Sequence, residues 1–373
     1  MTTTAPLLAP ASTAPTVSDL LERAREAAAT DLPGARALVQ QARVLAHADG
    51  DGPAESEALY LLAELCYASG LTNDAFAVAL ESRALARSCG AVITEVSALN
   101  LIAAVQYHAA NFSEALAAAV AALELYRTTG ERTSEGMLLN SLAVIQHGLH
   151  DTDRALVTYE AALMANKGEQ RPDLDAITLA NMAKVRADRH EELLAVSLGE
   201  SALELARDHA PEFVPEILAR LASAYVALSA LDRAAAVLEQ AEGILRDRAD
   251  RSVALSPLSL VTVRIAHGEL SAAQGRSEAA LVHWADALEL AADAQLTEMA
   301  LELRHRLASM YKQLGRFAEA LEHQEARYEL HREIIERGSD MRIKTIQIQH
   351  DMEIVRLQTE LLAYTRRHGG LAG

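Results

Sequence analysis

Small apolar residues recur along the chain with a period of about 40 residues. One position of the repeat is alanine at eight places: Ala35, Ala75, Ala115, Ala155, Ala195, Ala234, Ala280 and Ala320. The interval between them is constant, except that Ala234 comes one residue early and Ala280 six residues late. The positions twelve residues before and seven residues after each alanine are small in seven of eight cases, and the residue directly after it is apolar in seven. Two antiparallel helices approach closely only where facing side chains are small, so this register predicts about eight helical pairs.

Turn-forming residues such as Ser69-Gly70 and Gly275-Arg276 lie between the two helices of a predicted pair. We therefore expect an all-α chain whose helical pairs occupy residues 17–336. The seventh unit is preceded by six extra residues near 246–257, and a bend or break in the array is expected there.

The two ends of the array differ from its middle. The first unit has Arg23 and Arg36 where the other units have small or apolar residues, as expected of a terminal unit with one face in water. Residues 1–16 lack both a basic start and a sustained apolar segment, so they predict a disordered leader and not a signal peptide. The longest apolar run, residues 115–123, is too short to span a bilayer, and we expect a cytoplasmic protein without a membrane segment.

Composition supports this interpretation. Half of the residues are apolar, only 4% are aromatic, and glycine and proline are few, as is typical of an Ala- and Leu-rich helical protein. The net charge is −18, whereas a general nucleic-acid binder needs a basic face, so we expect no direct nucleic-acid partner.

Cys66 and Cys89 have neither CxxC spacing nor nearby histidine ligands, and both are expected to pack as reduced residues.

Two stretches carry a family resemblance. The segments NFSEALAAAVAALELY (111–126) and GRFAEALEHQEA (315–326) resemble tetratricopeptide (TPR) repeats, in a lengthened version of about 40 residues. The resemblance covers almost the whole chain. It implies a right-handed TPR-type α-solenoid of about eight helical pairs, with the first helix of each pair lining a concave groove that holds a protein or peptide ligand.

A different pattern follows the last repeat, where residues 318–366 contain no proline and only one glycine, Gly338. Apolar residues and two threonines alternate there at steps of four and three: Met341, Thr345, Ile348, Met352, Val355, Thr359 and Leu362. This heptad seam predicts a long helix over residues 337–366, with a flexible tail over residues 367–373. The helix either pairs in parallel with a second copy, giving a homodimer, or folds back to cap the solenoid.

The segment RIKTIQIQHDMEIVRLQTELLAYT (342–365) resembles the connector that follows sensory TPR arrays in bacterial signalling proteins. In those proteins the connector leads into a diguanylate cyclase or histidine kinase domain. Here eight residues follow the segment, RRHGGLAG, and no such domain is present in the sequence. The resemblance implies a signal-input module, and an alternative function is the sensory half of a cyclase or kinase system.

No catalytic motif accompanies the repeats. The sequence contains no G-x-x-x-x-G-K-[ST], G-x-G-x-x-G or G-x-S-x-G pattern, so we expect neither an enzyme nor a bound cofactor. His147, His150 and Asp151 are the only close group of metal-ligand types. We interpret them as solvated turn residues and expect no metal site.

Projecting the repeat onto the inner surface identifies candidate ligand-binding residues. Three successive turns of the first helices supply them: Tyr60, Asn100, Asn140, Asn181 and His305; then Glu64, Lys184 and Ser309; then Tyr67, Tyr107, His147 and Lys312. Asn100 and Asn140 are one repeat apart, and Asn181 lies one residue past the next equivalent position. Amides both donate to and accept from a peptide backbone, so such a row suits an extended ligand. The resemblance implies such inward asparagines, while the alternative is that they bond neighbouring repeats.

The single tryptophan, Trp284, falls on the second helix of the seventh unit among leucines. It is expected to pack inside that unit, with a surface anchor as the alternative.

Overall fold

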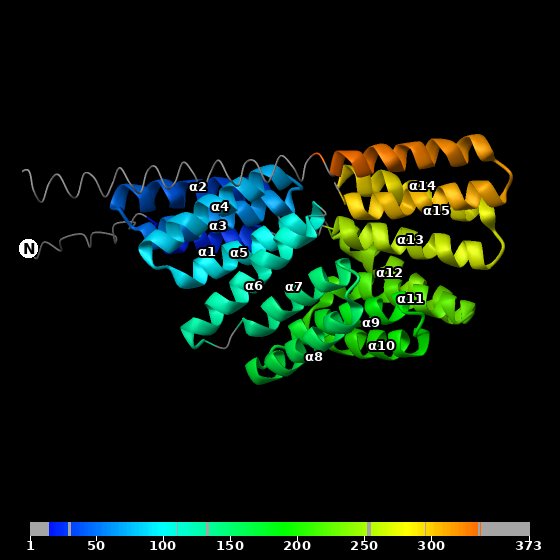
Figure 1. The fold of residues 1–373 in the computed structure, drawn as a ribbon, viewed down its shortest axis with the longest axis horizontal. Coiled ribbons are helices and arrows are strands. Elements are labelled where there is room, and N and C mark those ends of the chain that lie inside the picture. The colour runs from blue at the N-terminus through cyan, green and yellow to red at the C-terminus, as the bar shows by residue number, and fades with distance from the viewer. Residues whose placement is uncertain are drawn as a thin grey trace, which may run out of the picture.

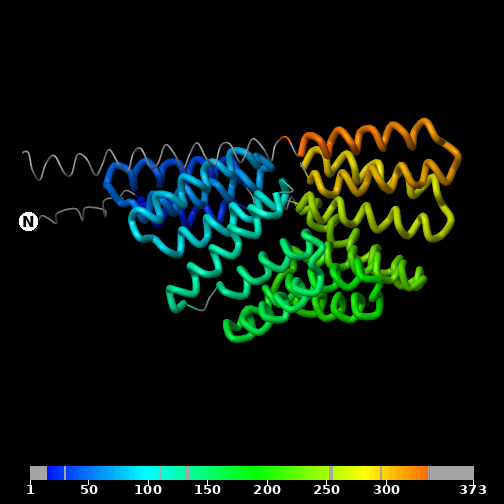
Figure 2. Tube along the Cα trace, in the orientation of Figure 1, coloured from blue at the N-terminus to red at the C-terminus, as the bar shows by residue number. Residues whose placement is uncertain are grey.

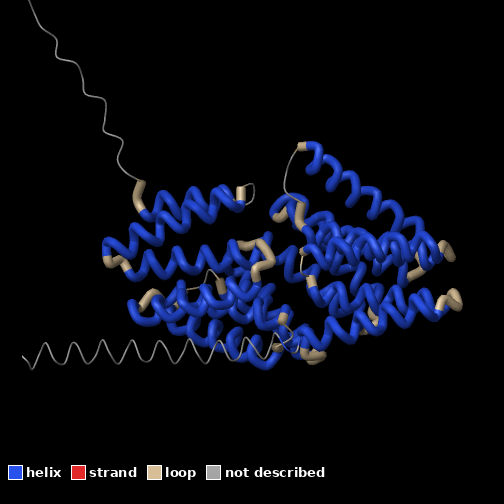
Figure 3. The backbone as a smooth tube through the Cα atoms, turned by 90° about the horizontal axis from the view of Figure 1, so that it is seen from above, coloured by secondary structure: helices blue, strands red, loops and turns tan. Residues whose placement is uncertain are grey.

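The computed structural model describes residues 15–28, 31–109, 111–131, 134–251, 255–294, 296–334 and 336, and every regular element within them is helical (Figure 3). The α-helices are α1 (Val17–Ala27), α2 (Leu32–Asp49), α3 (Gly52–Ala68), α4 (Thr72–Cys89), α5 (Val92–His108), α6 (Phe112–Thr129), α7 (Glu135–Gly148), α8 (Thr152–Glu169), α9 (Pro172–Asp188), α10 (Glu192–His209), α11 (Val214–Ala227), α12 (Leu231–Asp250), α13 (Pro257–Ala273), α14 (Ser277–Asp293) and α15 (Thr297–Gln313). A short 3-10 helix, η1 (Pro211–Phe213), precedes α11, and a last described helix occupies residues 317–334.

Consecutive helices pack as pairs, from α1 with α2 through to α13 with α14 (Figure 1). The last described helix completes an eighth pair with α15, because the Tyr311 and His323 rings stack with centroids 5.5 Å apart and Leu330 packs against the cluster around Leu303. Each pair also packs on the next, which gives an elongated array with α1–α4 toward one end and helix 317–334 at the other (Figure 2). The predicted all-α solenoid of about eight pairs is confirmed.

The predicted small residues lie at the contacts between paired helices. Among the repeating alanines, six have no exposed surface at all: Ala35, Ala75, Ala115, Ala155, Ala234 and Ala280. The small residues seven positions later are equally buried, among them Ser82, whose hydroxyl donates to the backbone oxygen of Ser56 on α3 at 2.8 Å. Close helix approach therefore explains the register, as expected from the sequence.

The turn inside each pair has a fixed conformation. Five residues before the repeating alanine, the backbone is left-handed at Gly70, His150, His190, Ser229, Gly275 and Gly315. Glycine adopts this conformation at little cost, whereas histidine and serine adopt it with strain. The turn geometry is therefore retained even where the sequence lacks glycine.

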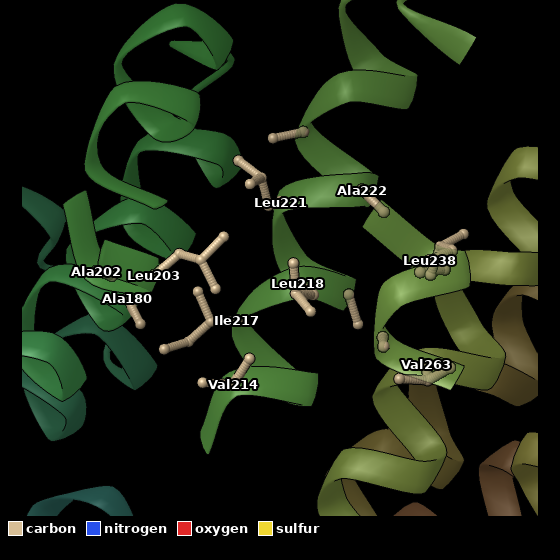
Figure 4. Packing of buried hydrophobic residues seen from close by; sticks show 14 of the residues in the cluster. Ala180, Ala202, Leu203, Val214, Ile217, Leu218, Leu221, Ala222, Leu238 and Val263 are labelled. Carbon is tan, nitrogen blue, oxygen red and sulfur yellow. The ribbon is translucent and has the colours of Figure 1, made fainter. Parts of the chain in front are cut away.

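The extra residues before the seventh unit change the packing of the array. They lengthen α12 to 20 residues, and α13 packs more extensively against α11 than against α12, the reverse of the other junctions. Figure 4 shows α11 at the centre of this region, with Ile217 directed toward Leu203 on α10 and Leu218 on the side that faces Leu238 on α12. The expected irregularity is thus a repacking within a continuous apolar core.

Trp284 packs inside the array, so the alternative of a surface anchor is wrong. Its indole Nε1 donates to the backbone oxygen of Ile265 at 3.2 Å, and only 5% of the residue is exposed. Gly268 makes this possible, because a Cβ at that position would lie 2.2 Å from the same nitrogen. The small residue twelve positions before the repeating alanine therefore leaves room for the indole ring.

The first described helix follows a capped turn. Thr16 caps α1: its hydroxyl accepts from Asp19 N at 3.2 Å, and the Asp19 carboxylate accepts from Thr16 N at 3.0 Å. Residues 1–14 of the expected leader, and all of the expected seam and tail after residue 336, lie outside the described residues. Within the described part, no helix combines the length and apolar character needed to cross a bilayer.

Candidate ligand-binding interior

First helices that are far apart in the sequence face a common interior. The pKa of Tyr107 on α5 is raised by burial first, and also by the charge of Glu298 on α15, while Arg220 on α11 opposes the shift. Glu298 is solvent-exposed, but the protein atoms around its carboxylate raise its pKa, and Lys184 on α9 opposes that shift. Charges are screened beyond about 10 Å in salt solution, so the side chains of Tyr107, Lys184, Arg220 and Glu298 lie within electrostatic reach of one another.

Two of the three predicted asparagines are in contact. Asn181 Nδ2 on α9 donates to Asn140 Oδ1 on α7 at 3.2 Å, although Asn181 lies one residue off the repeat phase. Asn100 on α5 is half-buried, and its Oδ1 is buried without a hydrogen-bond partner among the described residues. The amides thus form a half-buried row in which one bond links neighbouring repeats, while the Asn100 acceptor is buried and unbonded.

Lys184 lies one turn beyond Asn181 and is solvent-exposed. The protein atoms around it in this concave space lower its pKa, and Arg220 adds to that effect, while Asp188, Glu298 and Glu302 oppose it. The ammonium group is therefore within electrostatic reach of carboxylates on two helices, α9 and α15.

His147 and Asp188 link α7 to α9 at the next turn. Their side chains meet at 3.0 Å between Nε2 and Oδ2. Burial would raise the pKa of Asp188, but the hydrogen bond with His147 and the charges of Lys184 and Arg220 outweigh it, and the pKa lies below its ordinary value. His147 therefore pairs with Asp188 and not with its sequence neighbour Asp151. The Asp151 side chain instead caps α8 by accepting from Arg154 N.

An aromatic cluster closes one side of the interior. The His108 ring lies 5.3 Å from Tyr107 and 5.8 Å from Tyr67, and Tyr107 meets Phe112 edge-on at 5.6 Å. Burial raises the pKa of Tyr67 to about 12, and the protein atoms around the solvent-exposed His108 ring lower its pKa. These side chains are therefore uncharged near neutral pH, and they offer an apolar surface beside the amide row.

Tyr60 and Glu64, also predicted to face inward, bond to each other. The Tyr60 hydroxyl donates to Glu64 Oε1 at 2.6 Å along one turn of α3. Burial and the neighbouring carboxylate raise the pKa of Tyr60, and burial raises that of Glu64. On α15, the predicted His305 and Lys312 are exposed and Ser309 is half-buried.

Sequence reasoning missed Arg220 on α11 and three charged residues on α15, namely Glu298, Glu302 and Arg306. Arg220 donates twice to Glu216 Oε1, at 2.6 and 3.0 Å, and Arg306 joins Glu269 on α13 to Glu302, at 2.7 and 2.9 Å. One signal was available, because Arg220 has the same one-residue offset from the repeat as Asn181. The positions of Glu298 and Glu302 depend instead on the curvature of the array.

The described residues contain no group of three or more His, Cys, Asp or Glu side chains able to hold a metal ion. The interior instead offers amides, the exposed ammonium group of Lys184, several carboxylates and neutral aromatic rings. This mixture suits hydrogen bonding to an extended polar chain.

No protein-family model and no curated protein sequence matches the chain. Solved structures do match over most of its length. A Rap protein complexed with competence and sporulation factor is 15% identical with a TM-score of 0.60, covering 86% of this chain and 98% of that one. The apo quorum sensor NprR from B. thuringiensis is 16% identical with a TM-score of 0.61, covering 84% and 87%. The Rap conjugation gene regulator of plasmid pLS20, complexed with the Phr* peptide, is 10% identical with a TM-score of 0.63, covering 86% and 96%.

At these identities the similarity establishes the fold alone. The chain is an all-helical TPR-type solenoid, as its repeat register and paired helices indicate independently.

Proposed function

We propose that this chain is a non-enzymatic scaffold that binds an extended peptide, or an extended segment of a partner protein, in the interior lined by its first helices. The observation that carries the proposal is the amide row: Asn140 and Asn181 bond across a repeat boundary, with Lys184 one turn beyond them. A row of amides bonds a peptide backbone independently of side-chain sequence.

Asn100 adds a third amide to this row. Its Oδ1 is buried and has no partner among the described residues, and an unsatisfied buried acceptor costs about 1–3 kcal/mol. A rotation of the Asn100 amide that brings Oδ1 to a peptide N–H would remove this cost. The solved structures of similar fold that contain competence and sporulation factor or the Phr* peptide support a peptide as the ligand class.

The test uses a pooled library of short synthetic peptides, since extended peptides bind in grooves. Peptides retained by the full chain are identified by native mass spectrometry and titrated individually. Asn140→Ala should weaken the binding of a selected peptide by about tenfold, the effect of one lost hydrogen bond. Asn73→Ala, at an exposed position of the outer helix α4, is the matched control and should have no effect.

The residues after the array provide the second part of this proposal. Residues 341–362, with the seam Met341, Thr345, Ile348, Met352, Val355 and Leu362, pair two copies and pass the bound state of the interior to a partner. A ligand that prefers one curvature of the array would shift that population and reorient the attached segment. If ligand leaves the hydrogen exchange of residues 341–362 unchanged, transmission through this segment is wrong.

The alternative function is the sensory half of a diguanylate cyclase or histidine kinase system. The resemblance of residues 342–365 to the connector of such proteins favours it. It predicts a cyclase-like or kinase-like reading frame in the coding region directly downstream, and an unrelated sequence there would count against it. The compartment expected on either proposal is the cytoplasm.

A further inference from the structure

Two junctions in the middle of the array are joined by the same apolar contact. The residue eight positions after the repeating alanine packs there in one cluster with two residues of the next first helix. The two sets are Leu123 with Leu139 and Leu142, between α6 and α7, and Leu203 with Leu218 and Leu221, between α10 and α11. All six leucines are buried, so this contact belongs to the core of the array.

The junction between α12 and α13 has ionisable side chains in all three of these places, namely Glu242, Arg264 and His267. Glu242 Oε1 lies 3.6 Å from Arg264 Nη1 and 3.0 Å from His267 Nε2. A contact that is apolar in the middle of the array is therefore made here by ionisable groups. This is also the junction at which the extra residues change the packing of the array.

A second histidine extends this cluster. His283 of α14 stacks on His267, with ring centroids 5.3 Å apart and an angle of 27° between the rings. The Nδ1 atom of His283 is buried and has no hydrogen-bond partner among the described residues. The equivalent residues of the second and sixth units are Val78 and Val237, so this position is apolar in those units.

This environment stabilises neutral imidazole rings and destabilises imidazolium rings. An imidazolium donates from both ring nitrogens, but His283 Nδ1 has no acceptor. Two imidazolium rings at this separation would also repel each other and the guanidinium of Arg264. Partial burial lowers the pKa of both histidines, and Arg264 adds to both shifts, whereas Glu242 opposes them.

The other charges around the two rings do not reverse this balance. Asp286 of α14 opposes the shift in the pKa of His283, but Arg276 in the preceding turn adds to it. Two further carboxylates on the packed helices are paired with arginines: Glu216 with Arg220 on α11, and Glu269 of α13 with Arg306 of α15. Protonation of both rings would therefore add positive charge beside Arg264, with Glu242 as the carboxylate in contact.

We propose that the junction between α12 and α13 is a pH-sensitive hinge, which is closed while His267 and His283 are neutral and opens when both rings are protonated. In the open junction water would surround the rings, and each would have a pKa near the ordinary value of 6.5. Because the closed junction keeps the rings neutral to a lower pH, acid favours the open form below about pH 6.5. Opening would change the position of α15, with Glu298 and Glu302, relative to Lys184 on α9.

Hydrogen exchange of the full chain without ligand, at about pH 7.5 and about pH 5.5, tests the hinge, with rates corrected for the intrinsic effect of pH on exchange. The opening constant of α13 amides should rise by about tenfold in acid, since each histidine contributes up to tenfold for each unit by which the closed junction lowers its pKa. Amides of α3 and α5 should not change. An equal rise throughout the array, or no rise at α13, would overturn the inference.

Three variants assign the response to the two histidines. The double variant His267→Leu/His283→Val, which restores the residue types of Leu307 and Val237, should abolish it. His209→Gln, at an exposed position of α10, is the matched control and should retain it. Glu242→Gln should enlarge it, because this carboxylate opposes the shift in the pKa of His267. A response that persists in the double variant, or disappears in Glu242→Gln, would belong to another group and would overturn the inference.

The distance between two spin labels tests whether the two sides of the junction separate. Ser201→Cys on α10 and Val282→Cys on α14, both at exposed positions, carry the labels in a chain whose Cys66 and Cys89 are replaced by alanine. A second distance should appear at the lower pH and should be absent when His267 and His283 are replaced. Faster exchange of α13 with one unchanged distance would mean local fraying, and would overturn the hinge. Neither measurement depends on a ligand, so peptide binding in the interior is tested separately.

Discussion

Asn181 on α9 donates a hydrogen bond to Asn140 on α7, with 3.2 Å between Nδ2 and Oδ1. This bond joins two first helices whose asparagines are one residue further apart than one repeat. It shows that the side chain of Asn181 reaches the amide row despite its offset. Arg220, with the same offset in the next repeat, acts electrostatically on Lys184 and Tyr107 in the same interior.

Gly268→Ala should destabilise the protein by about 1–3 kcal/mol, the usual cost of overpacking a core. The added Cβ would lie 2.2 Å from Trp284 Nε1 and would displace an indole that bonds to Ile265. Urea unfolding followed by the fluorescence of Trp284, the only tryptophan, measures the change. Gly243→Ala on α12 is the control: nothing lies within 4 Å, and a gain of about 0.5–1 kcal/mol is expected. Equal effects of the two substitutions would contradict the packing described here.

Ser229→Gly should stabilise the protein by about 1 kcal/mol, because serine pays a steric cost for its left-handed backbone. Ser229 has φ of +60° in the turn between α11 and α12, and its side chain is exposed. The equivalent Gly275 has φ of +74°, so Gly275→Ala should destabilise by a similar amount. Thermal unfolding of both variants checks the pair, and the prediction is wrong if both shift the midpoint in the same direction.

Asp188→Asn should reduce stability at neutral pH, by less than about 1 kcal/mol because Asp188 is half exposed. The pKa of Asp188 is lowered in the folded protein, so its contribution is present above its ordinary value of 3.8 and is lost as the pH falls through the lower folded value. The difference between the variant and the unaltered chain should therefore be constant from neutral pH to about pH 5 and shrink in stronger acid. Unfolding free energies across this range measure it, with Asp208→Asn at an exposed position of the outer helix α10 as the control.

The sequence predicts the array well because the helix contacts depend on local composition. Close approach requires a small side chain, and Ala75 or Ala155 satisfies this requirement at a fixed spacing that is visible without a structure. The burial of Trp284 could also be predicted, because it falls among leucines on the second helix of its unit. The predicted C-terminal seam lies outside the described residues and stays a prediction.

The interior could be predicted only in part. Asn140, His147 and Lys184 follow from the repeat phase, but their partners do not. Asp188 and Glu298 reach this space because the array curves and brings α15 near α9, and curvature is the sum of small rotations at every junction. The irregular junction between α11 and α13 changes the curvature of the array. The spacing of the asparagines gives no indication of that change.

Hydrogen exchange with a peptide selected from the library tests the central claim most directly. If the ligand lies in the interior, backbone amides of α5, α7, α9 and α15 should gain protection together, while those of the outer helices α8 and α10 should not change. Asn140→Ala should remove this protection at the same peptide concentration, and Asn73→Ala should retain it. Protection confined to the outer helices, or unaffected by Asn140→Ala, would contradict a peptide site in the interior.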